Sequence, residues 1–306
     1  MNFYKIKEKL NIKRLIALVV ALVILFNLAV TVVISESFLN TEDFAQSERG
    51  QGLLVKPLSS SVYMKWLGGV AEDFQYEELK GICVKNNNTS HNSIVLVHSL
   101  TTTPLDMAVY AYHFYSLGFN VYIPEYITDV CTMGESERVV IADAINRISS
   151  KNEEACVFVF GLGMGATTSI LATTQSLPQN VKGIIADSPY SMVDRLFEEN
   201  INEIYGIKAF PVLYMSSVYI KAIKGWDTGN EYIISAARDS EIPIMYIHGT
   251  EDAVVPVEHS NNLFEVTRAK GSEHVTIHGA THLQGLNTDS EKYWREVDAF
   301  IRNSIE

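Results

Sequence analysis

The segment of the chain with the clearest chemical meaning is Gly161-Leu-Gly-Met-Gly-Ala166, which follows a short apolar run at residues 156–160. A strand, a tight glycine turn and a helix in this order can form two kinds of site. In a nucleophile elbow, Gly-x-Ser-x-Gly, the turn exposes a serine hydroxyl that attacks a carbonyl. In a dinucleotide site, Gly-x-Gly-x-x-Gly/Ala, the helix N-terminus binds a pyrophosphate and a later acidic residue binds the ribose. Gly163 stands where the elbow needs serine, whereas the glycine spacing and Asp187 fit the second pattern.

Two polar loops further along the chain favour hydrolytic chemistry. Residues 244–248 run into Gly249-Thr-Glu-Asp252, and residues 275–277 lead to Gly279-Ala-Thr-His282. Both loops fall at the carboxyl ends of expected strands, the edge at which open α/β sheets bind ligands. A nucleophile turn followed by an acid and then a histidine is one chain order of a catalytic triad. A dinucleotide site leaves both loops unexplained and expects its glycine turn after the first strand, whereas at least two strand candidates precede this one.

The elements around these loops predict an α/β fold. From Ile94 onward, short β-rich runs alternate with helical segments, which indicates a mostly parallel central sheet with helices on both faces. The expected strands are residues 79–84, 94–97, 121–123, 156–160, 183–186, 244–248 and 275–277. The expected helices are residues 106–117, 135–149, 164–176, 257–269 and 289–303. Residues 190–240 are too many for a simple crossover and rich in aromatics, so we expect a helical cap insertion. Its aromatic side chains either line a substrate pocket or pack the cap onto the sheet.

An uncharged run at residues 15–34 predicts a membrane-spanning helix, since twenty residues at 1.5 Å each cover about 30 Å, the thickness of a bilayer core. Basic residues precede the run and acidic residues follow it, so we expect residues 1–14 to form a cytoplasmic tail. The expected protein is a single-pass cell-membrane protein with a stalk and helical lead-in at 35–75 and an extracytoplasmic domain at 76–306. A cleaved signal peptide is disfavoured by the length of the run and by the absence of a small-x-small site after it.

Charge and cysteine content exclude several other classes. The 306-residue chain carries −12, of which the first fourteen residues contribute +4, leaving −16 for the remainder. Such an acidic body disfavours nucleic acid as a partner. Three widely spaced cysteines form neither a disulfide framework nor a zinc knuckle. His278 and His282 are four residues apart, but Gly279 and the strand context deny them a common helix face, so we expect no metal, and no cofactor is implied.

Together these motifs resemble the α/β-hydrolase superfamily, in particular its membrane-anchored bacterial serine aminopeptidase and monoacylglycerol-lipase-like branch. The resemblance covers about residues 76–303, and its matching segments are Gly161-Leu-Gly-Met-Gly-Ala166, Ala186-Asp-Ser-Pro-Tyr190, His248-Gly-Thr-Glu-Asp252 with Val255-Pro256, and Gly279-Ala-Thr-His282. It implies that Asp252 is the orienting acid and His282 the general base. The amides of Met164 and Leu100 would form the oxyanion hole.

The chain departs from this family pattern at three places. Ser99 replaces the glycine of the family's His-Gly pair, and Pro124-Glu-Tyr126 replaces its Pro-Asp-x-Arg-Gly-His-Gly run. Most important for chemistry, Gly163 occupies the nucleophile position and has no side chain with which to attack a carbonyl.

The missing hydroxyl leaves three hypotheses open. In the first, serine-hydrolase activity is weak or lost, because glycine relieves about 1–3 kcal/mol of elbow strain, and the protein is a cell-surface binding or accessory protein. In the second, His282 and Asp252 activate water to hydrolyse esters or small peptide-like amides. In the third, the nucleophile lies on the presumed oxyanion loop, at Ser99, Thr101, Thr102 or Thr103, although hydroxyls there more often satisfy loop amides or cap the helix at Asp106. The expected ligand is a small-molecule acyl ester, a lipid-like molecule or a peptide, and the sequence predicts no oligomeric state.

Overall fold

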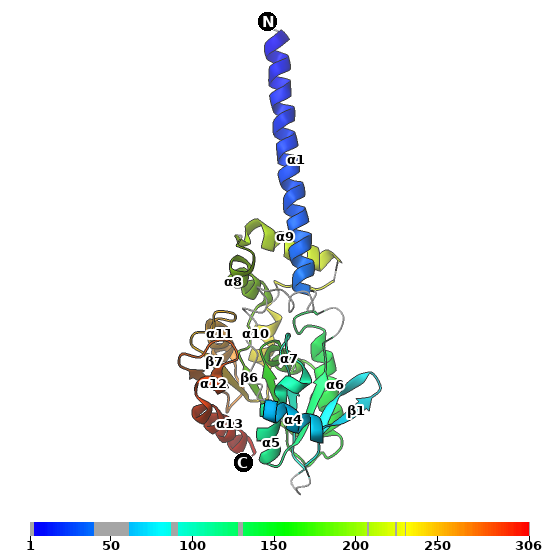
Figure 1. The fold of residues 1–306 in the computed structure, drawn as a ribbon, viewed down its shortest axis with the longest axis vertical. Helices are drawn as coiled ribbons and strands as arrows, with labels where there is room; N and C mark the ends of the chain where they lie inside the picture. The colour runs from blue at the N-terminus through cyan, green and yellow to red at the C-terminus, as the bar shows by residue number, and fades with distance from the viewer. Residues whose placement is uncertain are drawn as a thin grey trace.

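The structure, a computed structural model, describes residues 3–39, 61–86, 91–127, 131–206, 208–223, 225–229 and 231–305. Within these residues, helices on both faces cover an eight-stranded sheet, and the long helix α1 (Phe3–Leu39) projects from this body (Figure 1). The strands are β1 (Glu72–Tyr76), β2 (Leu79–Val84), β3 (Ser93–Val97), β4 (Asn120–Glu125), β5 (Val157–Leu162), β6 (Val181–Asp187), β7 (Ile244–Gly249) and β8 (Glu273–Ile277).

The sheet has the order β1-β2-β4-β3-β5-β6-β7-β8. The pairs β1 with β2 and β2 with β4 are antiparallel, and all other pairs are parallel. Every residue of the central strands β3, β5 and β7 is buried, as expected for apolar runs in a sheet that is covered on both faces. The predicted α/β fold with a mostly parallel sheet is therefore confirmed. Each predicted strand is present, and β1 is an additional edge strand.

Two hydrophobic layers enclose the sheet. One face is covered by α6 (Glu137–Ser149), α7 (Met164–Ala172), α10 (Tyr232–Asp239) and α11 (Glu258–Val266). The other face is covered by α4 (Ser61–Val70), the 3-10 turn η1 (Pro104–Met107), α5 (Ala108–Ser116), α12 (Gly285–Thr288) and α13 (Ser290–Ile305). Because β3, β5, β7 and β8 are parallel, the loops that follow them all emerge at the same edge of the sheet.

The body begins earlier in the chain than residue 76. β1 pairs with β2 along its whole length, and Leu67 of α4 is fully buried against the α5 layer. Both elements fall in the interval 35–75, which the sequence assigned to a stalk and helical lead-in. The helical part of that expectation corresponds to α4, whereas residues 40–60 lie outside the described residues.

The cap consists of α8 (Val193–Tyr205) and α9 (Ala209–Ile223), which pack against each other. The expected cap interval, 190–240, also contains α10, but α10 packs against α7 and α11 and therefore belongs to a layer of the body. The aromatic side chains of the interval differ in burial. Phe197 and Trp226 are buried in the core, whereas Phe210 and Tyr214 are 80% and 68% exposed on α9.

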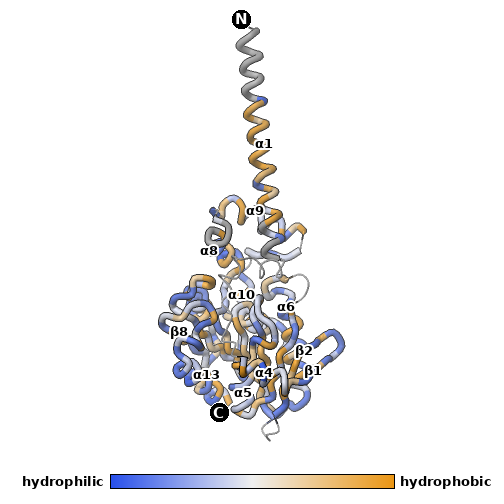
Figure 2. Tube along the Cα trace, in the orientation of Figure 1, coloured by the Kyte–Doolittle hydropathy of each residue, from blue (hydrophilic) through white to orange (hydrophobic). Residues whose placement is uncertain are grey.

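Helix α1 contains the one segment of the described residues that is long and apolar enough to cross a membrane, Arg14–Val33. Figure 2 shows this segment as a nearly continuous hydrophobic stretch outside the body. Its C-terminal part packs against α9 of the cap, where Val30 contacts a small cluster formed by Ile201 and Val212. The Tyr219 hydroxyl of α9 donates a 2.7 Å hydrogen bond to Glu36 of α1. By length and composition alone, α1 fits either a membrane anchor or a signal sequence.

Candidate active site

The glycine turn of the sequence forms a sharp junction between β5 and α7. Gly163 is the junction residue, with φ +53° and ψ −116°, and its N–H donates to the carbonyl of Asp187 at 2.8 Å. The glycines on either side are required by close approach, since a Cβ at Gly161 would overlap the α7 backbone and one at Gly165 would overlap the backbone of Val97 and His98. The turn therefore has the strand-turn-helix geometry of a nucleophile elbow, with glycine at its centre.

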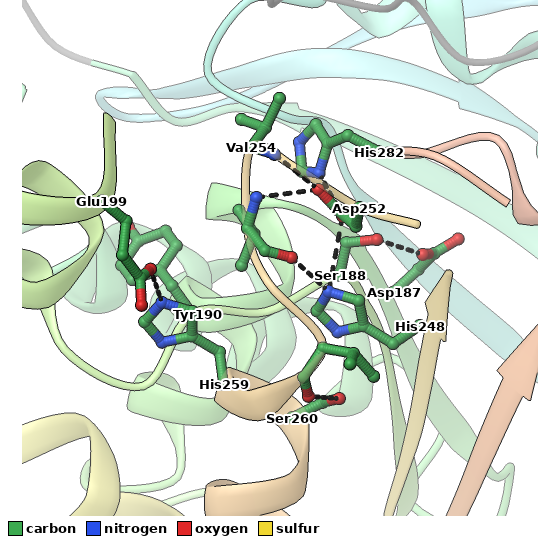
Figure 3. A network of polar contacts seen from close by, with 12 residues as sticks. Asp187, Ser188, Tyr190, Glu199, His248, Asp252, Val254, His259, Ser260 and His282 are labelled. Carbon is green, nitrogen blue, oxygen red and sulfur yellow. Dashed lines mark hydrogen bonds and ion pairs between the residues drawn. The ribbon is translucent and has the colours of Figure 1, made fainter. Parts of the chain in front are cut away.

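The acid and the histidine from the two downstream loops meet beside this turn. His282 Nδ1, from the loop after β8, lies 2.7 Å from Oδ2 of Asp252, which follows β7 (Figure 3). The other carboxylate oxygen of Asp252, Oδ1, accepts the N–H groups of Val254 at 3.0 Å and Val255 at 2.8 Å. Burial alone would raise the pKa of Asp252, but the adjacent His282 and the hydrogen bonds from His248 and His282 hold that pKa well below its ordinary value. The carboxylate is therefore ionised and fixed in orientation.

The second ring nitrogen of His282 points toward the elbow. A Cβ added to Gly163 would lie 3.8 Å from His282 Nε2. No hydrogen bond from another described residue occupies Nε2, so this nitrogen is available to accept a proton from a group at the elbow. The three segments that the sequence predicted to converge thus come together at one edge of the sheet.

His248, the last histidine before the acid loop, supports that loop from within the sheet. Its Nε2 lies 2.7 Å from the carbonyl oxygen of Val255 and 3.4 Å from Oδ2 of Asp252. Figure 3 shows Asp252 between His248 and His282. A donor at His248 Nε2 contacts both atoms, which fixes the loop that presents the carboxylate.

The two amides assigned to the oxyanion hole lie on segments that contact each other. Met164 is the first residue of α7, so its N–H has no partner within the helix. Leu100 lies in the loop after β3, whose preceding residues pack against Gly165 through the carbonyls of Val97 and His98. A turn with a 3.2 Å hydrogen bond from the Thr102 N–H to the Ser99 carbonyl holds this loop.

Asp187, which would bind the ribose in a dinucleotide site, is hydrogen-bonded to side chains inside the body. Its carboxylate is buried and accepts hydrogen bonds from the Tyr293 hydroxyl at 2.7 Å and the Ser188 hydroxyl at 2.9 Å. Burial raises the pKa of Asp187, and these two hydrogen bonds oppose the rise. The side chain joins β6 to α13 inside the body and is not presented to a ligand.

A second serine, histidine and carboxylate arrangement lies between the cap and the body, and no motif in the sequence predicts it. His259 Nδ1 accepts from the Ser191 N–H at 3.0 Å and lies 2.9 Å from its hydroxyl, while Nε2 contacts Glu199 at 2.8 Å. Ser191 is only 1% exposed and His259 is fully buried. Because Glu199 belongs to α8, this network connects the cap to α11 (Figure 3) and offers no access to a substrate.

The described residues contain no group of three or more His, Cys, Asp or Glu side chains able to hold a metal ion. His278, which the sequence places four residues before His282, is exposed. Cys131 lies near the elbow, with its Sγ 3.5 Å from Sδ of Met164. Burial and the neighbouring Glu137 raise the pKa of the Cys131 thiol to about 12, so this cysteine is not a thiolate nucleophile at neutral pH.

Comparison with known proteins agrees with the fold. No family model matches the chain. Uncharacterized protein YqkD of Bacillus subtilis (strain 168) is 23% identical over 233 residues, which are 74% of this chain and 76% of that protein. Among solved structures, the esterase Pf2001 of Pyrococcus furiosus superposes with a TM-score of 0.62 at 17% identity, covering 82% of this chain and all of the esterase.

Two further structures have the same architecture. The α/β hydrolase GrgF of Penicillium sp. sh18 matches with a TM-score of 0.54 at 15% identity, over 76% of this chain and 98% of GrgF. The acylaminoacyl peptidase of Pyrococcus horikoshii matches with a TM-score of 0.53 at 16% identity, over 76% of this chain and 41% of the peptidase. The chain therefore has the α/β-hydrolase fold, of the kind found in esterases and peptidases.

Proposed function

We propose that the protein hydrolyses carboxylic esters or small peptide-like amides, with His282 as the general base and Asp252 as the acid that orients it. The observation that carries this proposal is the 2.7 Å contact between His282 Nδ1 and Asp252, with Nε2, to which no described residue is hydrogen-bonded, directed at the elbow position. The buried carboxylate, held by two backbone amides beside a histidine, is an arrangement that orients a general base, which supports retained hydrolytic chemistry.

In this mechanism, Nε2 of His282 takes the proton of the attacking hydroxyl and later returns a proton to the leaving group. Such general base and acid help contributes about 10²–10⁴-fold in rate. The N–H groups of Met164 and Leu100 bind the oxygen of the tetrahedral intermediate, and each such donor contributes about 10²–10³-fold. The attacking hydroxyl belongs either to water or to a side chain near the elbow.

The test is turnover of p-nitrophenyl acetate by the full chain in detergent micelles. We expect His282→Ala to lower kcat/KM by about 10²–10⁴-fold. His278→Ala is the matched control, because this exposed histidine lies four residues earlier in the same loop and should leave the rate unchanged. Equal rates for the wild type and His282→Ala would refute the proposal.

The second candidate is a binding or accessory protein without turnover, which the glycine at position 163 favours. A groove of about 490 Å³ lies between α8 and α9 and is lined in part by Phe210, Leu213 and Tyr214. Charged side chains also line it, namely Asp194, Glu198, Lys221 and Asp227, so it suits an amphipathic lipid-like or peptide ligand. Binding of a fluorescent fatty-acid probe, lowered by Leu213→Asp and accompanied by no His282-dependent ester hydrolysis, would support this function over the first.

For the placement of the protein, we propose that α1 is retained as a single-pass anchor at residues 15–34, with a cytoplasmic N-terminus and the hydrolase-fold domain outside the cytoplasm. The basic tail supports this orientation. The packing of α1 on α9 supports retention, since cleavage after the apolar run would uncover the α9 surface that contacts α1. Protease added to intact expressing cells should digest the domain, and the mature chain should keep the mass of the uncleaved protein.

A further inference from the structure

The space beside Gly163 is occupied by the hydroxyl of Ser99. A Cβ built on Gly163 would lie only 2.7 Å from Ser99 Oγ, while Ser99 Cβ would be at an ordinary 3.5 Å. The same point is 3.8 Å from His282 Nε2. The Ser99 hydroxyl therefore lies in the volume that the side chain of an elbow serine would take, next to the base.

The residue types at the two positions are exchanged relative to the family pattern described above. That pattern has glycine after the histidine of the β3 loop and serine at the elbow, whereas this chain has His98-Ser99 and an elbow glycine at 163. The chain thus retains one serine hydroxyl beside His282, but that serine belongs to the loop after β3 and not to the elbow. Gly163 is what gives that hydroxyl room.

Other hydroxyls of the same loop are committed to local structure. Thr102 Oγ1 accepts the Ser99 N–H at 2.8 Å and donates to the Ser99 carbonyl at 3.1 Å. Thr103 Oγ1 donates to the carboxylate of Asp106 at 2.9 Å. These contacts fix the backbone of Ser99, while no hydrogen bond to a described residue holds its hydroxyl. A rotation about χ1 carries Oγ between staggered positions without moving the loop.

We propose that Ser99 is the nucleophile of this site, a step that rests on the proposed hydrolase function. Ser99 Oγ attacks the carbonyl carbon of the acyl substrate while His282 Nε2 accepts the hydroxyl proton. The bond to the leaving alcohol or amine breaks, and the leaving group takes the proton from His282. Water, deprotonated by the same histidine, then attacks the acyl-Ser99 ester and releases the carboxylic acid and Ser99. The proton that His282 takes from this water passes to Ser99 Oγ, so the serine and the histidine are both restored and the cycle consumes only the substrate and one water.

The experiment is covalent labelling of the full chain in detergent with a small fluorophosphonate, followed by peptide mass spectrometry. We expect a single label on Ser99, which Ser99→Ala abolishes and His282→Ala slows at least 10²-fold. Thr101→Ala, two residues further along the loop, is the matched control and should label normally. Ser99→Cys keeps the side-chain volume and should exchange fluorophosphonate reactivity for reactivity with iodoacetamide. In Ser99→Gly/Gly163→Ser, the label should move to residue 163.

The outcomes separate this inference from the proposed function. Loss of the label together with a loss of ester turnover of at least 10²-fold in Ser99→Ala supports both. His282-dependent turnover that is unchanged in Ser99→Ala means that water attacks directly, which overturns the role of Ser99 and leaves the hydrolase function in place. A label on Ser99 without His282-dependent turnover upholds the nucleophile and refutes the ester hydrolase. If Ser99 is not labelled and no His282-dependent turnover is found, both the role of Ser99 and the hydrolase function are refuted.

Discussion

Restoring the serine at the elbow by Gly163→Ser should destabilise the protein, and part of the cause should lie in Ser99. Two costs follow from the structure. Position 163 has φ +53°, and a side chain in such a disfavoured backbone region costs about 1–3 kcal/mol. In addition, the new Cβ would lie 2.7 Å from Ser99 Oγ, well inside van der Waals contact. Residues in direct contact show interaction energies of about 0.5–3 kcal/mol. When Ser99→Gly is added to Gly163→Ser, it should therefore restore about this much of the lost free energy of unfolding.

Thermal unfolding of the full chain in detergent measures this coupling. The two costs together come to about 1.5–6 kcal/mol, and one kcal/mol corresponds to about 2–4 °C for a domain of this size, so Gly163→Ser should lower Tm by about 3–24 °C. Ser99→Gly/Gly163→Ser should melt at least about 1 °C above the value expected from adding the two single effects.

Gly271→Ser is the control for backbone strain without crowding. Gly271 has φ +85°, and a Cβ there would meet only Pro243, at 3.9 Å. Gly271→Ser should change Tm by the same amount whether residue 99 is serine or glycine. Two results would refute the reasoning that Ser99 fills the elbow. One is that the Tm changes of Gly163→Ser and Ser99→Gly simply add in the double variant. The other is that Gly271→Ser shows a coupling with Ser99→Gly of the same size.

Three further predictions concern the polar groups around the site. The pKa of Asp252 in the folded protein lies below the unfolded value of about 3.9, so its carboxylate stabilises the fold above about pH 3.9, and this stabilisation is lost as the pH falls toward the folded pKa. Asp252→Asn removes this contribution and should therefore flatten the fall in Tm between about pH 5 and pH 3. Tyr293→Phe removes a donor from the buried Asp187 carboxylate and should cost about 1.5–3 kcal/mol of stability, read from the same melting curves. Ser191→Ala should cost about 1 kcal/mol yet leave fluorophosphonate labelling unchanged, because the buried contact with His259 is structural; a slower reaction with the probe would contradict that assignment.

The parts of the site that the sequence predicted are those encoded in short segments at strand ends. The elbow, the loop of Asp252 and the loop of His282 are each recognisable within a few residues of a buried apolar strand. Parallel strands then bring such loops to one edge of the sheet regardless of the connections between them. The same local periodicity predicted the central strands and the helices that cover them.

What the sequence did not reveal depends on contacts between distant segments. The approach of Ser99 to Gly163 follows from the packing of the β3 loop on Gly165, which no local pattern specifies. β1 carries a mixed burial pattern at the edge of the sheet, so its sequence lacks the apolar run of the inner strands. The contact of His259 with Glu199 spans sixty residues and becomes visible only once the cap is placed.

Helix α1 is joined to the cap by side-chain packing on α9 as well as by the chain itself. The contact at Val30 begins before the apolar segment ends at Val33, and the helix continues without a break to Leu39. In a bilayer, this arrangement would hold the cap against the headgroups, with the remainder of the body farther out (Figure 1). Molecules dissolved in the adjacent leaflet would then have a shorter route to the cap than to the remainder of the body.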